Sequence, residues 1–97
     1  MQFEWDPAKA RANLRKHGVP FREAFSIFWD PLGITFFDPD HSEEEERFIT
    51  IGFSDSGRLL MVAHTDRGER ICIISARELT HRELKEYEEE IKRRKDR

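Results

Sequence analysis

The chain has 97 residues, of which 38% are charged and 37% hydrophobic, with eight phenylalanines and a formal net charge of −3. This length fits one domain, residues 1–97, and the aromatic content excludes a disordered chain. The negative charge excludes a protein that coats nucleic acid non-specifically but allows a local basic cleft.

The cysteine content and the hydropathy indicate the cellular compartment of the protein. A single cysteine excludes an internal disulfide and suits a reducing cytoplasm. No stretch approaches the roughly 20 apolar residues of a membrane span, and the first residues lack the pattern of a signal peptide. We therefore expect a cytoplasmic protein that has no membrane segment.

The first thirty residues predict a short strand and two helices. Phe3 and Trp5 alternate with polar residues, Asp6-Pro7 is typical of a helix start, and Gly18 is typical of a helix end. Between residues 20 and 29, apolar side chains recur with helical spacing, at Phe21, Ala24, Phe25 and Phe28. These phenylalanines are expected to form core rather than a ligand groove.

From Ile34 onward the apolar pattern changes to a period of two, which predicts strands at 34–38, 47–54, 59–65 and 70–76. Short turns between the last three predict an antiparallel meander. The polar loop after the first strand is rich in acidic residues and is expected to be solvated. An alternative is a metal site formed by Asp38, Asp40, His41 and the glutamates of this loop.

A final helix is predicted from Thr80. Thr80 and Glu83 have the spacing of a capping box, and Leu79 and Leu84 that of a hydrophobic staple. The resulting order, β-α-α-β-β-β-β-α, predicts an α+β domain with about four antiparallel strands.

Catalytic signatures such as a glycine-rich phosphate loop or paired cysteines are absent from the sequence. The 66–69 turn is expected to bring His64, Arg67 and Arg70 to one end of the sheet. Arg77 leaves the last strand at its opposite end, so these groups need not converge.

Several motifs in order resemble BrnT-type toxins. They are F-E-W-D-P-A-K-A at the start, Lys16-His17-Gly18-Val19, Ile51-Gly52, His64-Thr65-Asp66-Arg67-Gly68 and Ile73-Ile74-Ser75-Ala76-Arg77. The resemblance covers essentially the whole chain. It implies a RelE-like fold and a small ribonuclease that blocks translation and is held inactive by a BrnA-like antitoxin. RNA would be the substrate, DNA would be contacted only through the antitoxin, and no cofactor or metal is implied.

The implied chemistry is attack of an RNA 2′-hydroxyl on the adjacent phosphate. Arginine suits phosphate because its planar fork pairs the oxygens, and histidine suits proton transfer near neutral pH. The residues that the resemblance assigns to catalysis are Lys16, His17, Arg67 and Arg77. His64 is added as an acid or base on chemical grounds, and Arg70 and Arg15 as phosphate contacts.

Two points stay open at this stage. Arg77 has an alternative role, that of locking the last helix to the sheet through Glu86 or Glu89. Cys72 stands where the family commonly has a basic residue. A second hypothesis for the whole protein is a RelE-like binding module without catalysis, which acts by complexing a DNA-binding antitoxin.

Overall fold

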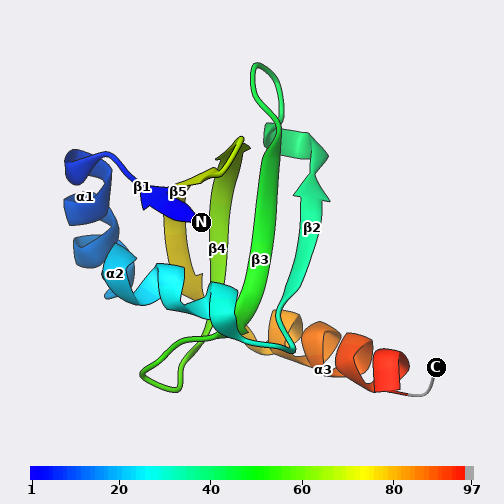
Figure 1. Ribbon diagram of the computed structural model, residues 1–97. Helices are drawn as coiled ribbons and strands as arrows, with labels where there is room; N and C mark the ends of the chain where they lie inside the picture. The colour runs from blue at the N-terminus through cyan, green and yellow to red at the C-terminus, as the bar shows by residue number, and fades with distance from the viewer. Residues whose placement is uncertain (96–97) are drawn as a thin grey trace.

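The computed structural model describes residues 1–95 as an α+β domain built on one mixed sheet (Figure 1). The sheet has five strands in the order β1-β5-β4-β3-β2. Their bounds are β1 Gln2–Glu4, β2 Ile34–Asp38, β3 Arg47–Phe53, β4 Leu59–Arg67 and β5 Arg70–Glu78. The expected meander is confirmed for β2 to β5. The prediction of a wholly antiparallel, four-stranded sheet is wrong, because β1 adds a fifth strand that runs parallel to β5.

The helices are α1 Pro7–His17, α2 Phe21–Ala24, η1 Phe25–Trp29, η2 Pro39–His41 and α3 His81–Lys95, where η marks a 3₁₀ helix. Asp6 caps α1 by accepting a hydrogen bond from the Ala8 amide, and Gly18 ends it with a left-handed φ of 69°. The predicted second helix differs from expectation: it is one α-helical turn that tightens into η1. Among residues 1–95, no helix has the length and apolar composition needed to cross a membrane.

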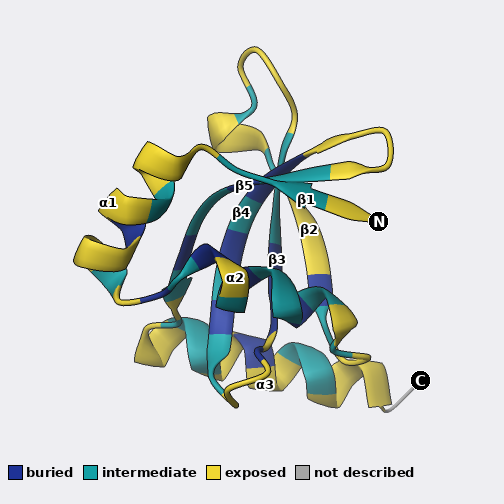
Figure 2. Ribbon diagram, turned by 60° about the vertical axis from the view of Figure 1, so that its left-hand side comes forward, coloured by how far each residue is buried: buried dark blue, intermediate teal, exposed yellow. Residues whose placement is uncertain are grey.

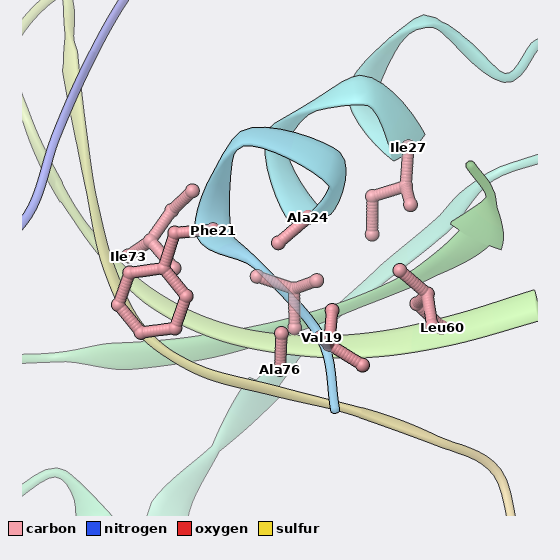
Figure 3. Close-up of a cluster of buried hydrophobic side chains, with 8 residues drawn as sticks. Val19, Phe21, Ala24, Ile27, Leu60, Ile73 and Ala76 are labelled. Carbon is pink, nitrogen blue, oxygen red and sulfur yellow. The ribbon is translucent and has the colours of Figure 1, made fainter. Parts of the chain in front are cut away.

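The main core lies between α2–η1 and one face of the sheet. Figure 3 shows Phe21, Ala24 and Ile27 pointing onto Leu60, Ile73 and Ala76, and all of them are buried. Gly52 permits this close approach, because a Cβ atom there would lie 3.1 Å from the backbone oxygen of Ile27. The phenylalanine-rich segment is therefore core, as its spacing predicted.

Asn13 joins α1 to the edge of β5. Its side chain donates to the backbone oxygens of Ala76 and Val19, and its Oδ1 accepts from the Ala76 amide, at 2.9–3.0 Å. Because β1 pairs only with residues 70–72, Asn13 takes over the role of a neighbouring strand farther along β5. The C-terminal half of α1 is thereby held beside the sheet.

The opposite face of the sheet is covered only at one end, by α3. Tyr87 packs with Ile34 and Ile51 in a second, smaller apolar cluster. The predicted capping box is formed, since the Glu83 amide donates to the Thr80 hydroxyl and the Glu83 carboxylate accepts from the Thr80 amide. In Figure 2, α3 runs below the sheet and β2 is coloured mostly as exposed. The remainder of this face is open.

Candidate nucleic-acid interface

Three adjoining hollows of about 420, 190 and 590 Å³ run along the open face of β3, β4 and β5. The first and second share His41 and Arg47, and the second and third share His41 and Arg77. We call them together the sheet groove. Its first end, near the 42–46 loop, is strongly charged, and its other end lies against α3. The lining side chains of the first end that carry a positive charge are Lys9, Arg47 and Arg67.

Arg67 lies at the first end of the sheet groove and is paired with the acidic loop. Its guanidinium donates to both carboxylate oxygens of Glu45, at 2.7 and 2.9 Å. This contact lowers the pKa of Glu45 and raises that of Arg67. Both side chains are largely exposed, so solvent weakens the pair. A carboxylate thus occupies the position that a planar phosphate oxygen pair would take on this guanidinium.

Arg77 lines the middle and far parts of the sheet groove, but its guanidinium is anchored to the protein. It donates to both carboxylate oxygens of Glu83, at 2.7 and 2.9 Å, and also contacts the Glu78 carbonyl and the Met61 sulfur. The hydrogen bonds from Arg77 lower the pKa of Glu83 to about 2. The alternative role as a lock between sheet and last helix is therefore formed in the structure, but through Glu83 in the first turn of α3 and not through Glu86 or Glu89 as expected.

His41 lines all three hollows of the sheet groove; the sequence analysis considered it only as a ligand of the alternative metal site and not as a residue of an RNA site. It ends η2, and its Nδ1 lies 2.9 Å from Oδ2 of Asp38. The imidazole is 64% exposed, whereas the Asp38 side chain is 14% exposed. The signal that could have found this pair is local: a carboxylate three residues before a histidine, with Pro39 between them.

Two further side chains complete the charged end of the groove. Thr65 is 4% exposed, and its hydroxyl oxygen is buried with no hydrogen-bond partner among residues 1–95. Cys72 pairs with Thr65 across β4 and β5 and lines the same hollow. Cys72, singled out in the sequence analysis, is thus part of the sheet groove.

His64 does not reach this surface. It lies on the core side of β4, 1% exposed, with its ring between Phe28 and Phe48. Its Nδ1 lies 2.7 Å from Asp66 Oδ1, and its Nε2 lies 2.8 Å from the Thr50 hydroxyl. Burial lowers the pKa of His64, while Asp66 acts in the opposite direction. Its contacts are structural, and we assign it no part in proton transfer to a substrate.

The other expected residues lie apart from the groove. Lys16 and His17 are the last two residues of α1 and precede Gly18. The Gly18 carbonyl accepts a hydrogen bond from Arg58, which lies in the turn region between β3 and β4. Arg15 is exposed on the same turn. Arg70 is paired with Arg67 across the turn, as expected, and Glu4 lies 3.4 Å from Arg70 and 3.8 Å from Arg67. The structure therefore brings Arg67 and Arg70 together and leaves the α1 residues elsewhere.

Within the described residues, His, Cys, Asp and Glu side chains form no group of three or more that could hold a metal ion. The alternative metal site at Asp38, Asp40 and His41 is therefore not formed. Instead, Asp38 and His41 form a pair, and the Asp38 carbonyl accepts a hydrogen bond from Ser42, whose hydroxyl accepts one from the Arg47 amide. These bonds fix the turn that carries His41.

The fold and the groove define a small α+β protein whose open sheet face carries guanidinium groups from three strands among a larger number of carboxylates. Such guanidinium groups suit an anionic ligand. The comparisons with known proteins are more specific. The family model of the ribonuclease toxin BrnT of type II toxin–antitoxin systems matches residues 5–83. The chain belongs to this family.

A solved structure agrees with the family match. The crystal structure of the Brucella abortus ribonuclease toxin BrnT matches with a TM-score of 0.63 and 25% sequence identity, over 84% of this chain and 99% of that one. A search of curated proteins finds no match. Membership of a toxin–antitoxin family also implies an antitoxin partner for this chain.

Proposed function

We propose that this protein is an endoribonuclease that cleaves RNA without a metal ion and inhibits translation in the cytoplasm until a BrnA-like antitoxin binds it. The observation that supports this most is the placement of Arg67, Arg47 and Arg77 along one groove. They come from three adjacent strands of a rigid sheet. Rigid elements hold such groups more precisely than loops do.

The reaction would be a transesterification at phosphorus. The RNA 2′-oxygen forms a bond to the adjacent phosphorus, and the bond from phosphorus to the 5′-oxygen breaks. Negative charge builds on the non-bridging oxygens in the transition state, and fixed guanidinium groups stabilise that charge. Arg47 and Arg67 line the charged end of the groove and are assigned this role. Arg67 would exchange its Glu45 partner for the phosphate, as Arg77 would have to exchange Glu83.

The test is cleavage of single-stranded RNA by protein freed of antitoxin, with EDTA present. We expect Arg47→Ala and Arg67→Ala each to lower kcat/KM on the order of 10²-fold, the cost typical of losing one charge-stabilising donor. Arg11→Ala is the matched control, since Arg11 is an exposed arginine of α1 outside the groove. Cleavage that requires a divalent metal, or that survives both substitutions together, would contradict the proposal.

The roles that the family resemblance implies for Lys16 and His17 stay predictions. Both lie outside the sheet groove, at the end of α1. Lys16→Ala and His17→Ala variants measured in the same assay decide the matter. Loss of cleavage without loss of folding would extend the site to the end of α1, whereas unchanged cleavage would confine it to the groove.

One observation favours the second hypothesis, a binding module without catalysis. Both arginines with the strongest motif support, Arg67 and Arg77, are already paired with carboxylates in the free chain. The same RNA assay separates the two functions, because a binding module forms the antitoxin complex and leaves RNA intact. Inhibition of a cell-free translation reaction by the purified protein would support the ribonuclease.

The antitoxin is expected to bind at the exposed edge of the sheet. β2 is the outermost strand on that side, and the side chains of Phe36 and Phe37 are 44% and 46% exposed. An edge strand offers unpaired backbone groups to a second chain. Phe36 also lines the far end of the sheet groove, so a partner seated there would lie against the groove itself.

A further inference from the structure

The Asp38–His41 pair stands at the junction of the sheet groove. His41 lines every hollow of the groove, Arg47 lines two of them, and Arg77 lines two. Of the four histidines in the sequence, His41 alone lines the groove. His64 is buried on the other side of the sheet, and His17 and His81 belong to the ends of helices.

The turn that carries the pair is held in place by the chain around it. Pro39 opens η2 and fixes its own backbone angle, and the Ser42 hydroxyl links the Asp38 carbonyl to the Arg47 amide. Asp38 is itself the last residue of β2 and pairs with Arg47 across the sheet. The carboxylate therefore starts from a rigid position, which limits where the imidazole can lie.

The chemistry of the pair is that of an oriented base. A mostly buried carboxylate that accepts a hydrogen bond from Nδ1–H fixes the tautomer and leaves the lone pair on Nε2. Because the imidazole is 64% exposed while the carboxylate is 14% exposed, Nε2 is the end that a ligand in the groove can reach. The same arrangement orients histidine in enzymes that activate hydroxyl groups.

We infer that His41 is the catalytic base that removes the proton from the RNA 2′-hydroxyl and that Asp38 is its positioning residue. The inference rests on the proposed ribonuclease function and deepens it. The proton passes from the 2′-oxygen to Nε2 as the 2′-oxygen bonds to phosphorus. The bond from phosphorus to the 5′-oxygen breaks, and the departing 5′-oxygen takes a proton from water. The hydroxide left behind takes the proton from the His41 imidazolium, which restores the neutral base. The products are a 2′,3′-cyclic phosphate and a 5′-hydroxyl, so atoms and charge balance.

The arginines of the groove supply the second half of the arrangement. Arg47 lines two of the hollows that His41 lines, so a phosphate bound to Arg47 would lie in a hollow that the imidazole also lines. The charged groups that line the groove together with His41 are Asp38, Asp40, Glu43, Glu44, Glu45, Arg47, Arg67, Lys9, Arg77, Glu83, Glu86, Glu90 and Arg94. Variants that alter these neighbours are therefore excluded from the controls.

The experiment compares wild type, His41→Ala, Asp38→Asn and His81→Ala in RNA cleavage with EDTA across pH 5 to 9. His81 is an exposed histidine at the start of α3 and serves as the matched control. We expect His41→Ala to lower kcat on the order of 10²- to 10⁴-fold, the range for losing a general base, with His81→Ala unchanged. Added imidazole should restore part of the activity of His41→Ala.

Asp38→Asn gives a readout that a merely structural residue would not move. Without the carboxylate the imidazole is no longer held in one orientation and one tautomer, so kcat should fall while KM changes little. Thermal unfolding of each variant checks that the turn still folds.

The outcomes distinguish a failure of the ribonuclease function from a failure of the roles given to His41 and Asp38. If wild type cleaves RNA and His41→Ala cleaves as fast, the role of His41 is overturned while the ribonuclease function stands. If Asp38→Asn leaves kcat unchanged, or raises KM while kcat stays the same, its role as positioning residue is overturned. If wild type cleaves no RNA, both the proposed function and this inference fail.

Discussion

The Arg77 guanidinium donates to both carboxylate oxygens of Glu83, at 2.7 and 2.9 Å, and so ties the last strand to the last helix. Glu83 also accepts from the Thr80 amide, so one carboxylate serves as helix cap and as anchor. This double use predicts a specific dependence of stability on pH.

Glu83→Gln should lower the free energy of unfolding by about 1–3 kcal/mol at pH 7, because a charged, partly buried hydrogen-bonded pair is lost. The pKa of Glu83 falls from 4.5 to about 2 in the folded state, so folding is favoured when the carboxylate is ionised. The contribution is fully present above about pH 4.5 and is lost as the pH falls towards 2. Urea unfolding of both proteins at pH 7 and pH 3 measures it. A difference between variant and wild type that stays constant over this range would contradict the account.

A second prediction concerns the pairing of Arg67 with Glu45. Removing this carboxylate in Glu45→Ala frees the guanidinium for phosphate, so RNA should bind roughly two- to fivefold more tightly, the modest gain expected at an exposed pair. Glu69→Ala, in the neighbouring turn, is the control for a simple change of net charge. Fluorescence anisotropy with a labelled, non-cleavable RNA at two salt concentrations is the measurement. Equal gains in both variants would show that the effect is one of net charge.

The buried His64 predicts a loss of stability in mildly acidic solution. Burial lowers its pKa in the folded state below the 6.5 of an ordinary histidine, so the unfolded chain binds the proton more readily. The contribution of neutral His64 to the free energy of unfolding is therefore fully present above about pH 6.5. It falls as the pH drops below this value, by up to about 1.4 kcal/mol per pH unit.

His64→Phe should remove this dependence, since phenylalanine keeps the ring between Phe28 and Phe48 but does not titrate. Denaturant unfolding at pH 7.5 and 5.5 compares the two proteins. If the variant loses as much stability as wild type on acidification, the titrating group is another one.

The exposed edge of the sheet predicts where the antitoxin binds. Phe36→Glu places a charge on the outer strand and on the wall of the groove, so complex formation with the antitoxin should weaken at least tenfold, as loss of a central aromatic anchor does. Leu14→Glu is the matched control, because Leu14 is 50% exposed on α1, at the other edge. Titration calorimetry with the purified antitoxin measures both. Unchanged binding by Phe36→Glu would place the interface elsewhere.

Local patterns in the sequence predicted local structure well. The Asp6 and Gly18 caps of α1, the Thr80–Glu83 box and the strand alternation all depend on neighbours within a few residues, and the structure confirms them. The parallel pairing of β1 with β5 was missed, because three residues carry almost no periodic signal and the partner strand lies 68 positions away, as in Gln2 with Arg70.

The candidate site depends on contacts that local patterns do not contain. Asn13 binds Ala76 across 63 positions, and Arg67 meets Glu45 across 22, so neither partner could be chosen from spacing. For His64 the signal was present: it alternates with Leu60 and Val62, which are core residues of the same strand. Strand alternation therefore indicated that His64 is buried, although the chemistry of an imidazole suggested a proton-transfer role.

The central claim is that the sheet groove cleaves RNA by attack of the 2′-hydroxyl, and the ends of the products test it most directly. A defined RNA should be incubated with purified, antitoxin-free protein and EDTA, and the fragments analysed by mass spectrometry. The account predicts a 2′,3′-cyclic phosphate on one fragment and a 5′-hydroxyl on the other. Fragments that carry a 5′-phosphate and a 3′-hydroxyl, or RNA that stays intact, would contradict it.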